Sequence, residues 1–313
     1  MRILLTGGAG FIGSLLAERM LASRYEVWVV DNFDPYYDPK IKRRNLRNAL
    51  ASQNFSLLEG DIRDRRFLER VFRKVKFDKV IHLAAKAGVR SSLKDPISYA
   101  DVNINGTINL LEACCQHPAR DFIFGSSSSV YGDCKIPYRE SEKRLNPLSP
   151  YGVTKLGGEQ ICYIYHRLYG MNMAVLRFFT VYGPRQRPDM AIHKFTKLIK
   201  SGKPIQIYGK GDSQRDYTYI DDIISGIMAV TKRRFSYEII NLGNSRRVRL
   251  SDLIRLLEEN LGKQAKLVYL PEEKAEPKVT WASISKASRL LDYKPATSIE
   301  EGIDHFLHWY KNA

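Results

Sequence analysis

Apolar runs of strand length alternate with longer segments of helical periodicity through the first part of the chain. The predicted strands, which contain few polar residues, span residues 2–7, 26–32, 55–62, 78–85, 121–132 and 172–179. Between them, apolar residues at helical spacing predict helices over residues 11–23, 66–75, 103–116 and 150–169. Strands with few polar residues that are separated by helices are typical of a parallel sheet covered on both faces. The pattern therefore predicts an α/β fold with a doubly wound parallel sheet.

The pattern becomes less regular after residue 188, where elements shorten and Gly and Pro become more frequent. Residues 235–244 form one more apolar run, which we expect to return to the main sheet. The chain would then contain two interleaved domains. We predict a nucleotide-binding domain of residues 1–177 with 218–244, and a smaller mixed α/β substrate-binding domain of residues 178–217 with 245–313.

The chain is strongly basic, with 50 Lys and Arg residues against 34 acidic residues and a formal net charge of +16 over 313 residues. The basic residues are scattered, and the clusters "KIKRRNLR" and "KRRF" are short. Clusters this short are typical of a solvated surface, so they do not predict nucleic-acid binding. The charge balance suits a polyanionic small substrate without identifying it.

Nothing in the sequence predicts a membrane segment or a metal site. No stretch approaches the roughly 18 apolar residues that a bilayer span requires. The N-terminal "MRILLTGGAG" has too short an apolar run for a signal peptide and is interpreted as a strand entering a turn. The cysteines show no metal-ligand spacing, which favours reduced structural thiols and a cytoplasmic protein; they are Cys114, Cys115, Cys134 and Cys162.

A glycine-rich turn joins the first predicted strand to the first helix. The segment "LLTGGAGFIGS" places Gly7, Gly10 and Gly13 at G-x-x-G-x-x-G spacing. Glycine permits a tight turn and lets backbone N–H groups approach a pyrophosphate, which the positive end of the following helix also attracts. The turn predicts a Rossmann-like dinucleotide site.

An acidic residue at the end of the second strand refines this prediction. Asp31 follows Gly13 by 18 residues, where a carboxylate accepts hydrogen bonds from both adenosine ribose hydroxyls and repels a 2′-phosphate. The cofactor is therefore expected to be NAD and not NADP. The next two strand ends supply further candidate cofactor contacts, which are Asp61, Ile62, Leu83, Ala84 and Ala85.

The segment "SPYGVTK" places Tyr151 and Lys155 on one face of a helix. Alone, it is also explained as an ordinary helix start. The fifth strand, however, ends in four serines that face the same crevice, and Ser127 can donate to a developing carbonyl. We expect the Lys155 ammonium and a bound nicotinamide to lower the pKa of Tyr151 from about 10 towards neutrality. Tyr151 would then act as general base for a sugar hydroxyl.

Together these motifs resemble the extended short-chain dehydrogenase/reductase family, specifically its nucleotide-sugar epimerases and dehydratases, over nearly the whole chain. The resemblance implies tightly held NAD that is recycled within each turnover. It also implies a homodimer joined by the helices around residues 100–117 and 150–169. Expected catalytic residues are Ser127, Tyr151 and Lys155; expected cofactor contacts are these last two with Gly7, Gly10, Phe11, Ile12, Gly13, Asp31, Asn32, Asp61, Ile62, Leu83, Ala84, Ala85, Lys86 and Phe179.

Three stretches resemble UDP-glucuronate 4-epimerases in particular, namely "DNFDPYYD", "AAKAGVRSSL" and "RFFTVYGPRQRPDMA". Thr180 stands where UDP-glucose 4-epimerases usually carry asparagine, and a hydroxyl there fits a pocket that binds a carboxylate. Arg185 and Arg187 are also explained as caps of a surface loop. The expected substrate contacts are Arg90, Ser127, Ser128, Ser129, Thr180, Arg187, Ala191, Gln206, Tyr208, Arg215 and Glu276.

The most favoured activity is the NAD-dependent 4-epimerisation of UDP-glucuronate to UDP-galacturonate through a 4-keto sugar. UDP-glucose/UDP-galactose 4-epimerisation is the alternative. Dehydratases and decarboxylases of the family usually carry acidic residues where Ser128 and Ser129 stand, which disfavours both reactions. A non-catalytic NAD-binding protein and a one-way dehydrogenase remain open at this point.

Overall fold

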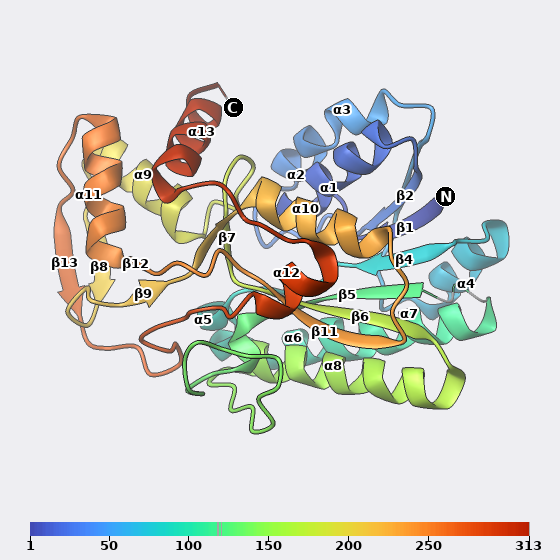
Figure 1. The fold of residues 1–313 in the computed structure, drawn as a ribbon. Coiled ribbons are helices and arrows are strands. Elements are labelled where there is room, and N and C mark those ends of the chain that lie inside the picture. The colour runs from blue at the N-terminus through green and yellow to red at the C-terminus, as the bar shows by residue number, and fades with distance from the viewer. Residues whose placement is uncertain (118, 120, 313) are drawn as a thin grey trace.

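The computed structural model describes residues 1–117, 119 and 121–312 and contains a seven-stranded, wholly parallel sheet with strand order β11-β6-β5-β4-β1-β2-β3 (Figure 1). The chain runs outward from β1 in both directions, which is the doubly wound arrangement predicted from the sequence. The strands are β1 (Arg2–Thr6), β2 (Glu26–Asp31), β3 (Phe55–Glu59), β4 (Lys79–His82), β5 (Asp121–Ser127), β6 (Asn172–Phe178) and β11 (Tyr237–Leu242).

Successive strand residues point to opposite faces of the sheet, so both faces of these apolar strands must be covered, and helices cover both. Ile3 and Leu5 of β1 join one apolar cluster with α1 (Phe11–Ala22) and α10 (Ile220–Thr231). Leu4 joins a second cluster on the opposite face, where Figure 1 shows the helices below the sheet. The helices of that cluster are α4 (Arg65–Lys74), α7 (Gly106–Gln116) and α8 (Pro150–Tyr169).

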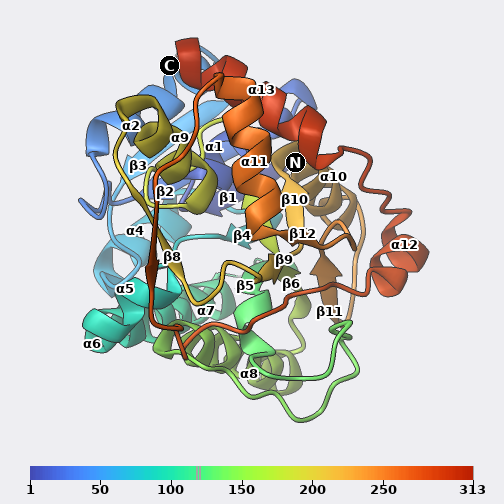
Figure 2. The ribbon, with the colours of Figure 1, turned by 90° about the vertical axis from the view of Figure 1, so that its left-hand side faces the viewer.

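Most of the smaller elements of the second region gather beyond one end of the sheet, at the left of Figure 1, whereas α12 (Ser285–Leu291) lies at the centre beside β11 and α10. Figure 2 views the molecule from the left-hand side of Figure 1. The strands of this region form three two-stranded pairs, which are β7 (Thr180–Tyr182) with β10 (Tyr217–Tyr219), β8 (Ile205–Tyr208) with β13 (Leu267–Leu270), and β9 (Gln214–Arg215) with β12 (Val248–Arg249). The helices that accompany α12 are α9 (Ala191–Ser201), α11 (Leu250–Leu261) and α13 (Ile299–Asn312).

The predicted domain boundaries remain a prediction. Lys286 of α12 lies within the predicted second domain, yet its ammonium pairs with Glu238 of β11 at 2.5 Å, in the main sheet. The two predicted domains therefore contact each other through side chains, in addition to the points where the polypeptide passes from one to the other.

The structure differs from the predicted elements at several strand ends and loops. The fifth strand ends at Ser127, because Ser128–Val130 turns into a 3-10 helix, five residues earlier than the predicted end at residue 132. The helix predicted from residue 103 is preceded by a π-helical turn, η1 (Asp101–Asn105). The sequence pattern missed four short helices, which are α2 (Pro39–Asn45), α3 (Arg47–Leu50), α5 (Val89–Lys94) and α6 (Pro96–Ala100).

No helix in the described part of the chain combines the length and the apolar character that crossing a bilayer demands. Within the same residues, His, Cys, Asp and Glu side chains form no cluster with the geometry to hold a metal ion.

Candidate active site

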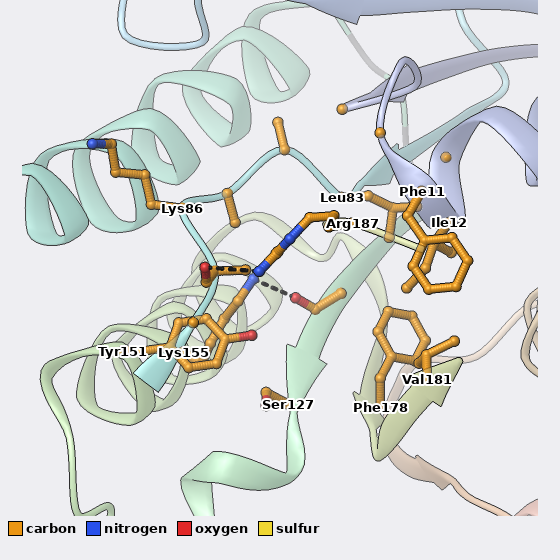
Figure 3. Close-up of a pocket in the computed structure, with 18 of the residues that line it drawn as sticks. Phe11, Ile12, Leu83, Lys86, Ser127, Tyr151, Lys155, Phe178, Val181 and Arg187 are labelled. Carbon is orange, nitrogen blue, oxygen red and sulfur yellow. Dashed lines mark hydrogen bonds between the residues drawn. The ribbon is translucent and has the colours of Figure 1, made fainter. Parts of the chain in front are cut away.

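A cleft of about 510 Å³ opens beyond the carboxyl ends of the sheet strands. Its walls come from the segments that follow six strands of the main sheet and from the second region. Parallel sheets of this topology bind ligands at this edge, because the loops there diverge and leave a crevice. Figure 3 shows the cleft from inside, with Tyr151, Lys155 and Ser127 on one side and Phe11 and Ile12 at the start of α1 on the other.

The glycine turn forms a wall of bare backbone. Gly7 has a φ of +72°, and a Cβ there would stand 2.7 Å from the backbone N of Ala84; a Cβ on Gly13 would stand 2.3 Å from the Gly7 oxygen. Packing therefore requires glycine at both positions. A Cβ on Gly10 would meet only the Gly7 oxygen at 3.3 Å, and α1 begins there without a side-chain cap. The helix N-terminus thus presents N–H groups to the cleft, which suits a pyrophosphate.

Asp31 holds a fixed position at the end of β2. Its carboxylate oxygens accept backbone N–H groups of Ala9 at 3.0 Å and Phe33 at 2.9 Å, so the side chain is pinned while it lines the cleft. Each oxygen keeps a further lone pair for a ribose hydroxyl. Asn32, which follows β2, donates to Asp61, which follows β3, at 2.9 Å and fixes a second polar group of the lining.

Tyr151, Lys155 and Ser127 converge from two elements. Ser149 caps α8 by accepting from the backbone N–H of Gly152, and Pro150 begins the helix, so Tyr151 lies in its first turn. The buried Lys155 ammonium, one turn later, donates to the Gly125 oxygen of β5 at 2.7 Å. The Ser127 hydroxyl accepts from the backbone N–H of Ser129 at 3.1 Å.

Burial acts on the pKa of both ionisable side chains of this group. Burial raises the pKa of Tyr151 above its ordinary value, opposed by the Ser127 hydroxyl and the positive charge of Arg187. Burial also lowers the pKa of Lys155 to about 8. For the protein alone, burial is the largest effect on the phenol, and the lowering expected from Lys155 together with a bound nicotinamide stays a prediction.

The opposite wall carries polar side chains from the second region. Thr180 opens β7, and its backbone N–H donates to the oxygen of Asp216 at 3.0 Å. Arg187 reaches the cleft from the following loop, where Nη2 donates to the Ala87 oxygen at 3.2 Å. Glu276 joins two cations across the cleft mouth, since Arg90 and Arg215 each pair with its carboxylate at 3.0 Å.

The neighbouring Arg185 plays a different part from Arg187. Its guanidinium donates to Glu18 at 2.8 Å and to the Asn45 oxygen at 3.1 Å, away from the cleft lining. The loop-capping role that the sequence left open for both arginines therefore fits Arg185.

Most predicted site residues line this one cleft. They are Gly7, Gly10, Phe11, Ile12, Gly13, Asp31, Asn32, Asp61, Ile62, Leu83, Ala84, Ala85, Lys86, Ser127, Ser128, Ser129, Tyr151, Lys155, Phe179, Thr180, Arg187, Arg215 and Glu276. Four others lie outside the lining, which are Arg90, Ala191, Gln206 and Tyr208. Arg90 and Tyr208 nonetheless adjoin it, because the Arg90 guanidinium stacks 4.0 Å from the Tyr208 ring centroid and pairs with Glu276.

Several lining residues were not predicted from the sequence. Tyr36 and Tyr37 lie in "DNFDPYYD" and Asp189 lies in "RFFTVYGPRQRPDMA", so the polar side chains of these two stretches could have identified them. Others, such as Gly125 and Val181, approach the cleft only because of the tertiary fold.

The fold and the cleft define a dinucleotide-binding α/β enzyme with a Tyr-x-x-x-Lys pair beside a serine. Residues 4–306 match the family model described as GDP-mannose 4,6 dehydratase. The chain belongs to this family, which lies within the extended short-chain dehydrogenases/reductases.

Three similar proteins are named as 4-epimerases of UDP-sugars. A UDP-glucuronate 4-epimerase of Thermodesulfobacterium geofontis is 45% identical over 98% of this chain and 95% of its own length. The crystal structure of a UDP-glucuronic acid 4-epimerase from Bacillus cereus, in complex with UDP-glucuronic acid and NAD, is 41% identical with a TM-score of 0.95, covering 100% of this chain and 99% of the other. A UDP-glucose 4-epimerase from Thermotoga maritima, solved with UDP-glucose, is 33% identical with a TM-score of 0.91 and the same coverages.

Proposed function

We propose that this protein is an NAD-dependent UDP-sugar 4-epimerase whose preferred reaction converts UDP-glucuronate to UDP-galacturonate. One observation carries the proposal: a single cleft joins the glycine turn, the Tyr151–Lys155 pair and the polar wall of Thr180 and Arg187. The two relatives described above whose names contain glucuronate or glucuronic acid support the same reaction, and at 45% and 41% identity they are more similar to this chain than the Thermotoga maritima UDP-glucose 4-epimerase at 33%.

NAD fits the residues present. The glycine turn and the first turn of α1 would hold its pyrophosphate, and Asp31 its adenosine ribose. Lys155 and Tyr151, which line the same cleft, would hold the other ribose. When bound, NAD would supply the chemistry of accepting a hydride from sugar C4 and returning it to the opposite face.

Tyr151 is the proposed base for the proton on sugar O4. A phenol with a raised pKa stays protonated at neutral pH and cannot accept a proton, so positive charge nearby is needed to favour the phenolate. Arg187 is one such cation, and its charge already opposes the effect of burial on the pKa of Tyr151. Lys155 is a second, because with a pKa of about 8 it remains protonated at neutral pH. Ser127 is proposed to donate to O4 as it becomes a carbonyl oxygen.

The sugar carboxylate is proposed to bind Thr180, Ser128 and Arg187. Oxidation at C4 makes UDP-glucuronate a β-keto acid, which loses CO2 when the C5–C6 bond aligns with the carbonyl π system. Hydrogen bonds to both carboxylate oxygens would hold that bond out of alignment. Ser128, Thr180 and Arg187 all line the same cleft, which supports this set.

Arg90 and Arg215 are proposed to bind the diphosphate, and Glu276 the uridine ribose. Both arginines pair with the carboxylate of Glu276, so two cations and one anion lie close together. Tyr208 and Gln206, on β8, and Ala191, at the start of α9, stay proposed substrate contacts outside the cleft lining.

We also propose a homodimer and a cytoplasmic location. Apolar side chains exposed on α8 support the first, and these are Val153, Ile164, Leu168 and Tyr169. Exposing such an apolar face to water is unfavourable in free energy, so a second subunit that covers it would stabilise the protein. The four cysteines are unpaired, which suits a reducing compartment.

The test is to incubate the purified protein with UDP-glucuronate and with UDP-glucose in separate reactions and to resolve the products by NMR. UDP-galacturonate without net reduction of added NAD is the expected result. Galactose product alone would favour the UDP-glucose alternative, and UDP-pentose as the main product would favour decarboxylation.

A further inference from the structure

The guanidinium of Arg187 is held by a carboxylate two residues along the chain. Nε donates to Asp189 Oδ1 at 2.9 Å, and Nη2 donates to Asp189 Oδ2 at 2.8 Å. This fork-to-fork geometry fixes the plane of the guanidinium as well as its position. Nη2 also donates to the Ala87 oxygen at 3.2 Å. Among the described residues, Nη1 alone of the three nitrogens has no hydrogen-bond acceptor in the protein.

Asp189 is held in turn from the nucleotide-binding side of the cleft. The hydroxyl of Tyr36 donates to Asp189 Oδ2 at 3.2 Å and lies 2.6 Å from the Ser91 hydroxyl. The Arg187 guanidinium lies 5.4 Å from the centroid of the Tyr36 ring. Tyr36 belongs to the stretch "DNFDPYYD", in which the proposed function uses Asp31 but gives Tyr36 no direct role.

These contacts join three segments that are distant in the sequence. Tyr36 follows β2, Ser91 lies on α5 and Asp189 lies in the loop before α9. Although burial alone would raise it, the pKa of Asp189 is held below its ordinary value by the hydrogen bonds and charge of Arg187. The carboxylate is therefore ionised at neutral pH and pairs with the guanidinium throughout the working range.

We propose that Asp189 is a positioning residue for Arg187, and that Tyr36 supports Asp189 from across the cleft. The inference rests on the proposed function, in which Arg187 binds the sugar carboxylate. A free arginine samples many rotamers and pays their entropy when it binds, whereas a clamped one has lost them already. The clamp also leaves one nitrogen, Nη1, without a protein acceptor, so the substrate carboxylate meets a guanidinium of fixed orientation.

The consequence is control over a side reaction. When the C5–C6 bond of the 4-keto sugar aligns with the carbonyl, that bond breaks and CO2 leaves. Its electron pair passes into the C4 carbonyl as an enolate, which takes a proton at C5 and yields a 4-keto pentose. A loosely held Arg187 would let the carboxylate reach this alignment more often.

The experiment measures the ratio of UDP-pentose products, the 4-keto form included, to UDP-galacturonate formed from UDP-glucuronate. Asp189→Asn keeps the shape but weakens the charge-assisted pairing, and we expect the ratio to rise about tenfold. Tyr36→Phe removes one hydrogen bond to Asp189, and we expect a rise of about threefold. The ratio is independent of the fraction of folded enzyme, so partial unfolding does not imitate the effect.

Glu18→Gln is the matched control. It weakens the 2.8 Å ion pair between Glu18 and Arg185, which ties the start of the same loop to α1 outside the cleft lining. This variant should lose stability without changing the ratio. A rise in the control equal to that of Asp189→Asn would overturn the inference, because general loosening of the loop would then explain both.

A double variant separates positioning from a direct role. If Asp189 acts through Arg187, adding Asp189→Asn to Arg187→Ala should leave the ratio of Arg187→Ala unchanged. An unchanged ratio in both Asp189→Asn and Tyr36→Phe, while Arg187→Ala raises it, would overturn the inference and leave the proposed function intact. If the wild type forms no UDP-galacturonate, the proposed function fails and the inference fails with it.

Discussion

Lys155 donates from its buried ammonium to the backbone oxygen of Gly125 at 2.7 Å, at the point where β5 reaches the cleft. The contact anchors the charge to the main sheet, one helical turn from Tyr151. A buried ammonium is nevertheless costly, because burial favours the neutral amine. The lysine therefore keeps its position at the expense of stability, as functional sites often do.

This cost predicts a pH dependence of stability. The pKa of Lys155 falls from 10.5 to about 8 on folding, so the unfolded chain binds more protons between these values. The contribution of Lys155 to the free energy of unfolding should rise by about 3 kcal/mol across that window and be flat below it. Denaturant titrations from pH 7 to 11 should show this rise in the wild type relative to Lys155→Met. Parallel curves for the two proteins would contradict the prediction.

Tyr151→Phe should abolish turnover without loss of the fold. Loss of a general base costs about 100-fold to 10,000-fold in rate, and the phenyl ring still fills the same space. Initial rates with UDP-glucuronate, together with the ratio of bound NAD to protein, measure the two effects separately. Near-normal turnover would refute the base assignment.

The glycine turn offers a variant that tests ligand binding with little effect on folding. A Cβ on Gly10 meets only one atom, at 3.3 Å, so Gly10→Ala should cost about 1 kcal/mol of stability or less. The methyl group would occupy the space into which the backbone faces the cleft, and NAD affinity should fall about tenfold or more. Calorimetric titration with NAD checks this.

Gly7→Ala is the contrasting variant. Its φ of +72° and the 2.7 Å approach to Ala84 N predict a large loss of stability in addition to the loss of NAD affinity. Equal stabilities of the two alanine variants would show that the turn packs differently from the structure.

Thr180→Ala and Arg187→Ala should both release more UDP-pentose per epimerisation. Each variant removes a proposed hydrogen bond to the sugar carboxylate, and an increase of about threefold to tenfold is expected for each. Product analysis by NMR gives the ratio directly. Unchanged partitioning in both variants would remove them from this role.

The buried ion pair between Arg177 and Glu159 should have a large effect on the free energy of unfolding when one partner is removed. Arg177 on β6 and Glu159 on α8 are 1% and 0% exposed, and they make hydrogen bonds of 2.9 and 2.7 Å. Arg177→Met would leave Glu159 buried without its partner and should cost about 3–5 kcal/mol. The double variant Arg177→Met/Glu159→Leu should recover most of that loss, as measured by urea unfolding. A double variant no more stable than Arg177→Met would contradict this explanation.

The main sheet, the nucleotide turn and most of the cleft lining can be predicted from the sequence alone. Apolar strands that alternate with helices admit few arrangements, because parallel strands must be covered on both faces. The residues at their carboxyl ends then meet at one edge, so Gly10, Asp31, Ser127 and Tyr151 could be placed together without coordinates. Their identities alone indicated the chemistry.

The partner of each charged side chain, in contrast, depends on the folded arrangement. Arg185 and Arg187 are equivalent in the sequence, yet one pairs with Glu18 outside the cleft lining and the other with Asp189 inside it. The pKa of Tyr151 likewise depends on burial and on Arg187. The separation of these two residues in the sequence does not show that they are close in space. Hydrogen bonds and desolvation act through space, so neither can be predicted from the order of residues before the chain has folded.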